Sequence, residues 1–223
     1  MTTASPPAGP GAPAARMPWG ALGLVMLLVG LAGAGVVVLL RPHIEFTNEL
    51  AGPVRLVVGN GAPRTVLPGG QVRLAVARGA TSVAQWDLIR PLSADKQPMG
   101  SEVRGSAVLR DPTGTTQVRA TSRTADQAYF APHITNATAQ ALRVLVNAGL
   151  QGAIDCGCAV RPGGRRVYIG YYPLFRNSTV RARGPGNTSA EFQDLGAQVT
   201  RADGVVGLRF EDKDLRGALT SER

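Results

Sequence analysis

Apolar and polar residues alternate in short runs along most of the chain after Leu40, as they do in half-buried β-strands. The runs Val54–Val58 and Val72–Val76 each place apolar side chains on every second position. Asn60-Gly61 and Pro68-Gly69-Gly70 lie between these runs and favour turns. The pattern predicts consecutive antiparallel strands.

The same alternation continues to the end of the chain. Further strands are predicted at Ala107–Leu109, Gln117–Ala120, Leu142–Asn147, Arg166–Tyr172 and Ser178–Arg183. Near the end, Gln198–Thr200 and Val205–Phe210 flank the turn Ala202-Asp203-Gly204, which predicts a terminal hairpin. After residue 41, only the short stretch Phe192–Ala197 has helical periodicity, so the body is predicted to be all-β.

One strand-turn pattern occurs twice. Phe46-Thr47-Asn48, a short spacer and Val54–Val58 recur 88 positions later as Ile134-Thr135-Asn136 and Leu142–Val146. Each copy leads to a Pro-Gly-Gly turn, but the second copy is six residues longer before that turn. The duplication predicts two tandem Ig-like or transthyretin-like β-sandwich domains, at 41–130 and 131–223.

The first forty residues do not have the composition of a globular domain. Residues 1–18 are rich in Pro, Ala and Gly, which predicts a disordered tail. Residues 19–40 carry no charge before Arg41 and are long enough to cross a bilayer, which predicts one transmembrane helix. Ala32-Gly33-Ala34 also fits the cleavage site of a signal peptide, although the apolar run continues beyond it.

This layout predicts a single-pass protein of the cell membrane, with its body on the periplasmic or extracellular side. A short tail, one anchor and an all-β body are typical of that location, and long domains cross the membrane largely regardless of their charge.

The net charge of +9 does not indicate nucleic-acid binding. Nearly all basic residues are arginines, with Lys96 and Lys213 the two lysines, and they are spread along strands rather than gathered in one block. The inventory for catalysis is thin: the two histidines, His43 and His133, precede the repeated Thr-Asn pairs, and no nucleophile elbow or phosphate-binding loop is present. We therefore expect a protein that is not an enzyme and has no cofactor.

Cys156 and Cys158 are the two cysteines, and they lie in the longer connection of the second copy. On an extended segment, residues two apart point to the same side. Two such thiols can bind a soft ion such as Cu(I), cycle between dithiol and disulfide, or form a structural disulfide. With one anchor and a sandwich body, this pair is similar in outline to the membrane-anchored, Ig-like copper chaperones that assemble cytochrome oxidase. Those proteins have aromatic residues beside the cysteines, where this chain has Gly157 and Ala159.

An aromatic stretch follows the cysteines and is surrounded by arginines. It contains Tyr171, Tyr172, Leu174 and Phe175, and its basic neighbours are Arg165, Arg166 and Arg176. Aromatic residues and arginine are enriched at protein interfaces, and the same composition suits anionic lipid headgroups. The alternative is a buried strand followed by a proline turn.

These observations lead to two hypotheses. The first is a non-catalytic accessory or scaffolding subunit of a membrane protein complex, which contacts another subunit or lipid headgroups through its second β domain. The second is a membrane-tethered assembly factor that binds Cu(I) or exchanges disulfides through Cys156 and Cys158.

Overall fold

The computed structural model describes residues 42–76, 81–109, 114–148, 150 and 153–216. Strands dominate this part of the chain, and the body Pro42–Arg223 is one compact unit. The predicted tail at 1–18 and the predicted transmembrane helix at 19–40 lie outside the described residues. Within the described ranges, none of the helices has the length and apolar character needed to span a membrane.

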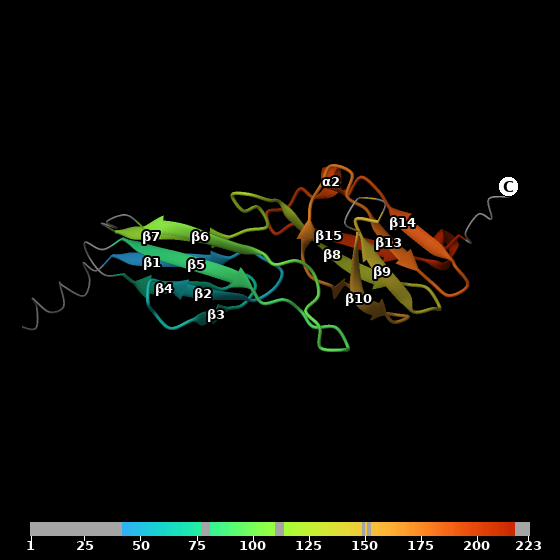
Figure 1. The fold of residues 1–223 in the computed structure, drawn as a ribbon, viewed down its shortest axis with the longest axis horizontal. Helices are drawn as coiled ribbons and strands as arrows, with labels where there is room; N and C mark the ends of the chain where they lie inside the picture. The colour runs from blue at the N-terminus through green and yellow to red at the C-terminus, as the bar shows by residue number, and fades with distance from the viewer. Residues whose placement is uncertain (1–41, 77–80, 110–113, 149, 151–152, 217–223) are drawn as a thin grey trace, which may run out of the picture. The chain divides into compact units, whose positions relative to one another are not determined.

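The described residues of the first half of the body form seven strands in two sheets (Figure 1, blue to green). The strands are β1 (His43–Asn48), β2 (Val54–Val58), β3 (Arg64–Val66), β4 (Gln71–Ala75), β5 (Ser82–Leu88), β6 (Arg104–Leu109) and β7 (Thr115–Ala120). One sheet has the order β4-β1-β7, and the other has the order β3-β2-β5-β6. Strand β1 is antiparallel to β4 and parallel to β7.

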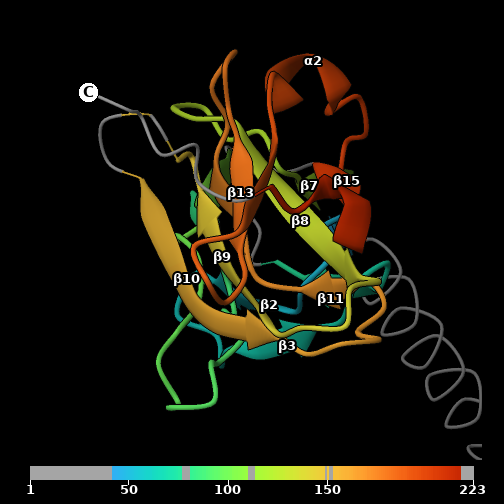
Figure 2. The ribbon, with the colours of Figure 1, turned by 90° about the vertical axis from the view of Figure 1, so that its right-hand side faces the viewer.

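The second half repeats this arrangement. Its strands are β8 (Tyr129–Asn136), β9 (Leu142–Val146), β10 (Ile154–Val160), β11 (Val167–Tyr168), β12 (Tyr172–Pro173), β13 (Val180–Arg183), β14 (Ser189–Phe192) and β15 (Val205–Phe210). One sheet has the order β10-β9-β13-β14, and Figure 2 shows β10, β9 and β13 side by side. In the other sheet, β8 pairs with β11, β12 and β15. The pairings of β8 with β11 and β15 match those of β1 with β4 and β7, and β14 corresponds to the edge strand β6.

The predicted terminal hairpin is wrong. Leu195–Gln198 forms the short helix α2, and β15 runs parallel to β8 instead of returning along a neighbouring strand. A turn at Ala202-Asp203-Gly204 is present, but it leads from the helix into β15, which pairs with β8 alone among the described strands.

Each half has its own hydrophobic cluster between its two sheets. In β5, Ala84, Trp86 and Leu88 point into the cluster of the first half, while Gln85 remains exposed, because strand side chains alternate between faces. The second cluster is built in the same way from β8, β9, β13 and β15.

The repeated asparagine ends the first strand of each half. In the first half, Asn48 is fully buried, and its side-chain nitrogen donates to the carbonyls of Gly52 (3.0 Å) and Val66 (2.9 Å). Its side-chain oxygen accepts a hydrogen bond from the backbone N–H of Leu50 (3.0 Å). One side chain therefore joins the connection after β1 to the end of β3.

Asn136 makes the corresponding bonds in the second half. It is fully buried, and it donates to the carbonyls of Gln140 (2.7 Å) and Val160 (2.8 Å) and accepts from the N–H of Thr138 (3.0 Å). The sequence repeat thus preserves a buried polar network as well as an apolar pattern.

Candidate functional site

The predicted aromatic interface needs correction at Tyr171 and Tyr172, because both side chains are fully buried. Tyr172 packs in the second cluster at 6.4 Å from the ring of Phe130, and its hydroxyl donates to the carbonyl of Ile169 (2.9 Å). A partner cannot reach either ring in the folded body. For these two residues, the alternative of a buried strand applies.

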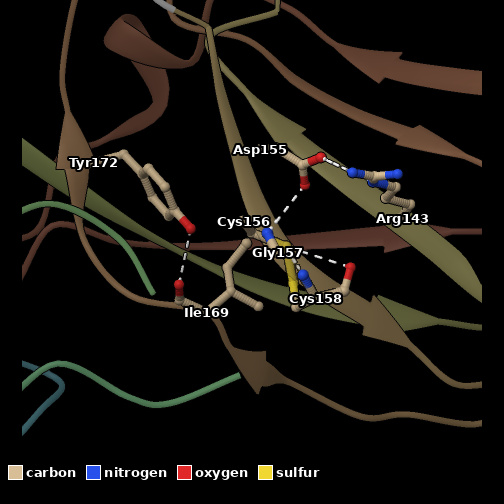
Figure 3. The surroundings of a disulfide bond; sticks show 7 residues. All are labelled: Arg143, Asp155, Cys156, Gly157, Cys158, Ile169 and Tyr172. Atoms are coloured by element: carbon tan, nitrogen blue, oxygen red, sulfur yellow. Dashed lines mark hydrogen bonds and ion pairs between the residues drawn. A yellow bond between two sulfur atoms is a disulfide. The ribbon is translucent and has the colours of Figure 1, made fainter. Parts of the chain in front are cut away.

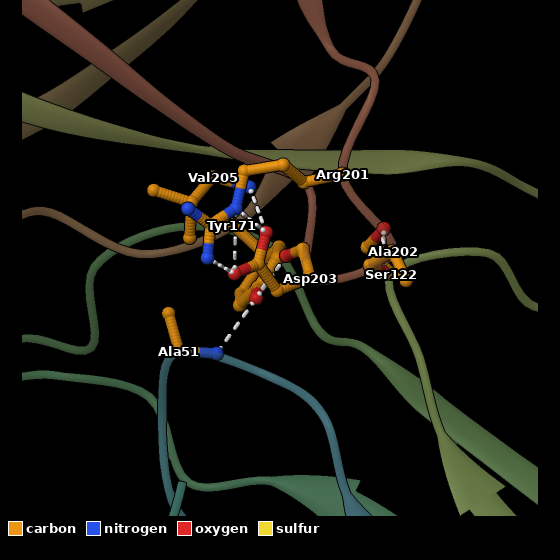
Figure 4. Close-up of polar contacts among 7 residues, drawn as sticks. All are labelled: Ala51, Ser122, Tyr171, Arg201, Ala202, Asp203 and Val205. Atoms are coloured by element: carbon orange, nitrogen blue, oxygen red, sulfur yellow. Dashed lines mark hydrogen bonds and ion pairs between the residues drawn. The ribbon is translucent and has the colours of Figure 1, made fainter. Parts of the chain in front are cut away.

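Tyr171 connects the two halves (Figure 4). It follows β11 in the chain, but its ring belongs to the hydrophobic cluster of the first half. Its hydroxyl accepts a hydrogen bond from the backbone N–H of Ala51 (2.9 Å) and donates to the carbonyl of Asp203 (2.5 Å). Burial raises the pKa of this hydroxyl above its usual range, so it stays protonated and able to donate.

Close backbone contacts reinforce this junction. Ser101 donates its N–H to the carbonyl of Tyr171 (2.7 Å), and a Cβ on Gly100 would lie 2.7 Å from that same oxygen. Gly170 approaches the chain at Met99 in the same way, and both glycines have positive φ. Glycine is required at both positions by conformation and by space.

The remaining residues of the predicted interface lie at two separate places. Phe175 is 44% exposed and Arg176 is exposed, whereas Leu174 packs partly against the second cluster. Arg165 and Arg166 are also exposed, but they lie on the turn before β11.

The separation follows from the pairing along β8. Arg166 donates its backbone N–H to the side-chain oxygen of Thr135 (3.2 Å), near the end of β8, while Leu174 bonds to the carbonyl of Ala128, just before its start. At about 3.3 Å per residue, these anchor points are roughly 20 Å apart. The sequence-predicted set is therefore not one patch.

Cys156 and Cys158 form a disulfide within β10 (Figure 3). Gly157 between them has φ +64°, and the pairing register with β9 shifts across this segment, so the three residues form a bulge. Cys156 is 4% exposed and packs in the second cluster, while Cys158 is only partly buried.

Asp155 precedes the bulge and fixes it. Its carboxylate accepts the backbone N–H of Gly157 (3.0 Å) and the side chain of Arg143 (Nε, 2.8 Å). Burial raises the pKa of Asp155, but these hydrogen bonds outweigh it and hold the pKa below its usual value. Both sulfurs are used in the disulfide, and the described residues contain no group of three or more metal-ligating side chains. Cu(I) binding at this site would first require reduction.

A groove of about 970 Å³ lies in the first half, along the edge strands β6 and β7. Its lining includes Trp86 and Gly105, and a Cβ on Gly105 would lie 2.5 Å from the Trp86 ring. Five arginines line the groove: Arg55, Arg90, Arg104, Arg119 and Arg123. Three acidic residues also line it: Asp87, Glu102 and Asp126. Positive charge is therefore in excess.

Three of these arginines have carboxylate partners. Arg55 lies 2.9 Å from Asp87, Arg90 lies 3.8 Å from Glu102, and Arg119 lies 3.0 Å from Glu49.

The other two arginines, Arg104 and Arg123, are exposed and form no ion pair with any residue that the structure describes. Their side chains are available to an anionic partner.

A smaller groove of about 620 Å³ occupies the corresponding place in the second half, beside β14 and β15. Its charges balance, since three basic residues lie with three acidic ones: Arg209, Lys213, Arg216, Glu191, Glu211 and Asp214. The chain itself enters this groove, because Arg216 exchanges two backbone hydrogen bonds with Ser189 of β14 (2.8 and 3.0 Å). The second groove is thus partly filled by its own chain.

The sequence did not predict the groove in the first half. Its arginines come from β2, β6, β7 and two connections, and each one taken alone has the pattern of a solvent-facing residue. The useful signal would have been the pairing of β6 with β5, which places Arg104 next to Asp87.

No protein-family model and no curated protein sequence matches the chain. Among solved structures, the chain is similar to a mutant of the shaft pilin SpaA from Lactobacillus rhamnosus GG, at 8% sequence identity and a TM-score of 0.27. The match covers 76% of this chain and 97% of the pilin chain. At that TM-score, the likeness carries no argument about this protein.

Proposed function

We propose that this protein is a non-catalytic accessory subunit of a membrane complex, held by a single helix at 19–40 and binding another protein through the edges of its β body. The observation that carries this proposal is the pair of grooves at corresponding edges, one partly filled by the protein's own chain and one lined by unpaired arginines. Open strand edges are suited to binding a segment of another chain.

The body in this proposal consists of two tandem sandwich domains, as the sequence duplication predicts. The strand order favours the transthyretin-like form over the immunoglobulin form. In a constant-type immunoglobulin domain, the first, second, fourth and fifth strands share a sheet, whereas here β2 and β5 lie in the sheet opposite β1 and β4.

The Cys156–Cys158 disulfide supports a body on the periplasmic or extracellular side. Disulfides form and persist in oxidising compartments and are rare in the cytosol. An uncleaved anchor at 19–40 would then hold the body close to the membrane surface.

The test is purification of the full-length protein in mild detergent through a C-terminal tag, followed by identification of the proteins that accompany it. We expect stoichiometric membrane-protein partners. We also expect a thiol reagent to label Cys156 and Cys158 only after the disulfide is reduced, and only when the reagent can reach the periplasmic or extracellular face. A protein that purifies alone under crosslinking as well as without it would contradict the accessory role.

A surface control can be included in the same experiment. Phe175→Ala with Arg176→Ala alters the exposed part of the predicted second-domain interface, and Arg165→Ala with Arg166→Ala alters the basic turn at the other end of β8. If only one of these two double variants loses its partners, the end of the second half that it alters is the one that takes part in binding.

The second candidate function is disulfide exchange through Cys156 and Cys158, which is favoured by their position in one bulge with Cys158 partly exposed. Exchange proceeds by attack of an external thiolate on one sulfur, with release of the other as a thiolate. Reversible reduction by a dithiol, together with loss of cellular function in the Cys156→Ser, Cys158→Ser variant, would support this function. A fully active double variant would dispose of it.

A further inference from the structure

The outer edge of β6 presents unused backbone groups. In the β5–β6 ladder, Val103 and Leu88 form a hydrogen-bonded pair, since Leu88 donates to the carbonyl of Val103 (2.8 Å). Hydrogen-bonded residues alternate along an antiparallel strand, so the backbone groups of Arg104, Ser106 and Val108 point away from β5. β6 pairs with β5 alone among the described strands.

The second half shows what occupies such an edge when a chain is available. Gly184 donates to the carbonyl of Thr188 (2.9 Å), so these two residues form a hydrogen-bonded pair. By the same alternation, the backbone groups of Ser189 and Glu191 point outward. Arg216 then bonds both outward groups of Ser189 in an antiparallel bridge.

Position by position, Arg104 of β6 corresponds to Ser189 of β14. Trp86 of β5 lies opposite β2 at the same place at which Ala182 of β13 lies opposite β9. On the edge strands, the partner of Trp86 is Gly105 and the partner of Ala182 is Ala190. The segment after the last strand of the first half lines the groove at residues 123–126 but makes no backbone hydrogen bond to β6 among the described residues, and it leads on into β8. The bridging position beside Arg104 is open within the described chain.

The charges indicate what this edge accepts. The lining of the first groove has five arginines and three carboxylates, with Arg104 and Arg123 unpaired among the described residues, whereas the lining of the second groove is balanced. An added strand rich in Glu or Asp would complement the first groove, and a basic strand would be repelled.

We propose that the groove along β6 and β7 binds an extended acidic segment of a partner protein, which adds to β6 as an antiparallel strand. This inference rests on the proposed accessory function and names the chemistry of the partner. Backbone hydrogen bonds to Arg104, Ser106 and Val108 hold the segment, and Arg104 and Arg123 select its acidic side chains.

The experiment measures binding of two fluorescent octapeptides to the full-length protein in non-ionic detergent. One peptide alternates Glu and Thr, and the other alternates Lys and Thr. We expect the acidic peptide to bind about tenfold more tightly or better, with an affinity that falls as salt is added.

Three variants separate strand addition from simple charge attraction. Ser106→Pro removes an outward N–H, together with an exposed hydroxyl, at an edge position where proline is tolerated, and should weaken binding by about fivefold. Arg104→Glu with Arg123→Glu should weaken it by about tenfold or more. Arg73→Glu changes an exposed arginine of β4, outside the groove, and should leave the affinity within about twofold.

Each other outcome overturns the inference. An unchanged affinity in Ser106→Pro means that the arginines attract anions without strand addition, and equal losses in Arg73→Glu mean a diffuse charge effect. Binding of the wild-type protein to anionic lipid vesicles but not to the peptide, with vesicle binding lost in the double glutamate variant, would assign the arginines to a headgroup. A concentration-dependent dimer lost in Ser106→Pro would assign the edge to a second copy. If partners still co-purify with all three variants, this inference fails while the accessory function stands.

Discussion

Asn48 and Asn136 are the residues that tie sequence repeat to structure most directly. Each is fully buried and uses its amide to satisfy two carbonyls and one N–H of the neighbouring connections. A buried carbonyl or N–H that loses its partner destabilises the folded state by about 1–3 kcal/mol. The amide is therefore needed for stability, whatever the body binds.

Asn48→Ala should lower the free energy of unfolding of the first half by about 2–3 kcal/mol, because three backbone groups lose their partner. Urea unfolding can follow Trp86, which is 5% exposed, in a Trp19→Phe background that leaves it as the only tryptophan. The exposed-site control Asn60→Ala should change stability by less than about 0.5 kcal/mol. Equal stability of the Asn48 and Asn60 variants would contradict this role.

We expect His133 to make the second half sensitive to acid. Both ring nitrogens are shielded from solvent and lack a hydrogen-bond partner among the described residues, and the ring contacts Tyr168 at a centroid distance of 5.7 Å. Burial lowers the pKa of His133, and the nearby Arg166 and Arg201 lower it further against the opposing effect of Asp203.

The lowered pKa determines the sign of the pH dependence. The unfolded chain binds a proton near pH 6.5 and the folded body only at lower pH, so stability is present above about pH 6.5 and is lost as the pH falls below that value. His133→Phe should reduce this loss between pH 7.5 and pH 5 in thermal melts, while His43→Phe serves as the control. A wild-type midpoint that is constant over this range would refute the assignment.

At the scale of elements, the alternating pattern predicted strands well where each has one buried face. Val54–Val58 and Val205–Phe210 match β2 and β15 along their whole length. β5 was not predicted, although Ala84, Trp86 and Leu88 alternate with polar residues, because Gln85 and Asp87 are less typical of strands.

The candidate site was less predictable because it depends on which strands become neighbours. The predicted strand Arg166–Tyr172 is broken at Gly170, where φ is +103°, and this break turns Tyr171 into the first cluster. The arginine-lined groove needs the pairing of β5 with β6 and the approach of β7. Local periodicity does not encode either relation.

Strand β10 contains the feature that distinguishes the two copies. Its bulge at Cys156-Gly157-Cys158 has no counterpart in the short β3, and Cys156 packs in the second cluster. The disulfide closes a very small loop, so its effect on the unfolded chain is modest.

Reduction of the disulfide should lower the stability of the second half by about 1.5 kcal/mol, the amount expected from the entropy of a three-residue loop. Urea unfolding with and without dithiothreitol can be followed by circular dichroism, which reports on both β-rich halves, while Trp86 fluorescence reports on the first half and should shift less. The Cys156→Ser, Cys158→Ser variant should be insensitive to the reductant. A shift of the Trp86 transition larger than that of the circular-dichroism transition would contradict the assignment of this stabilisation to the second half.

At the scale of the whole body, Tyr171 makes the two halves depend on each other. Its ring fills the first cluster, while its hydroxyl bonds to Ala51 of the first half and Asp203 of the second. The contact places one residue of the second half in the core of the first.

Tyr171→Phe should keep the ring in place and destabilise both halves by about 1–2 kcal/mol, because the N–H of Ala51 loses its acceptor. Tyr172→Phe is the matched control, since its hydroxyl bonds to Ile169 within the second half. The Trp86 transition should shift in Tyr171→Phe and stay in place in Tyr172→Phe. Equal effects of the two variants on Trp86 would contradict the coupling.

The position of Tyr171 also sets an order of events during synthesis. The last strand of the first half ends at Ala120, so the ribosome must add roughly fifty more residues, over a few seconds, before Tyr171 is available. Throughout that interval the chain contains the residues of every described strand of the first half but lacks one of its largest core side chains. We therefore expect the nascent first half to stay incompletely packed until Tyr171 arrives, with part of its apolar cluster open to a chaperone during this interval.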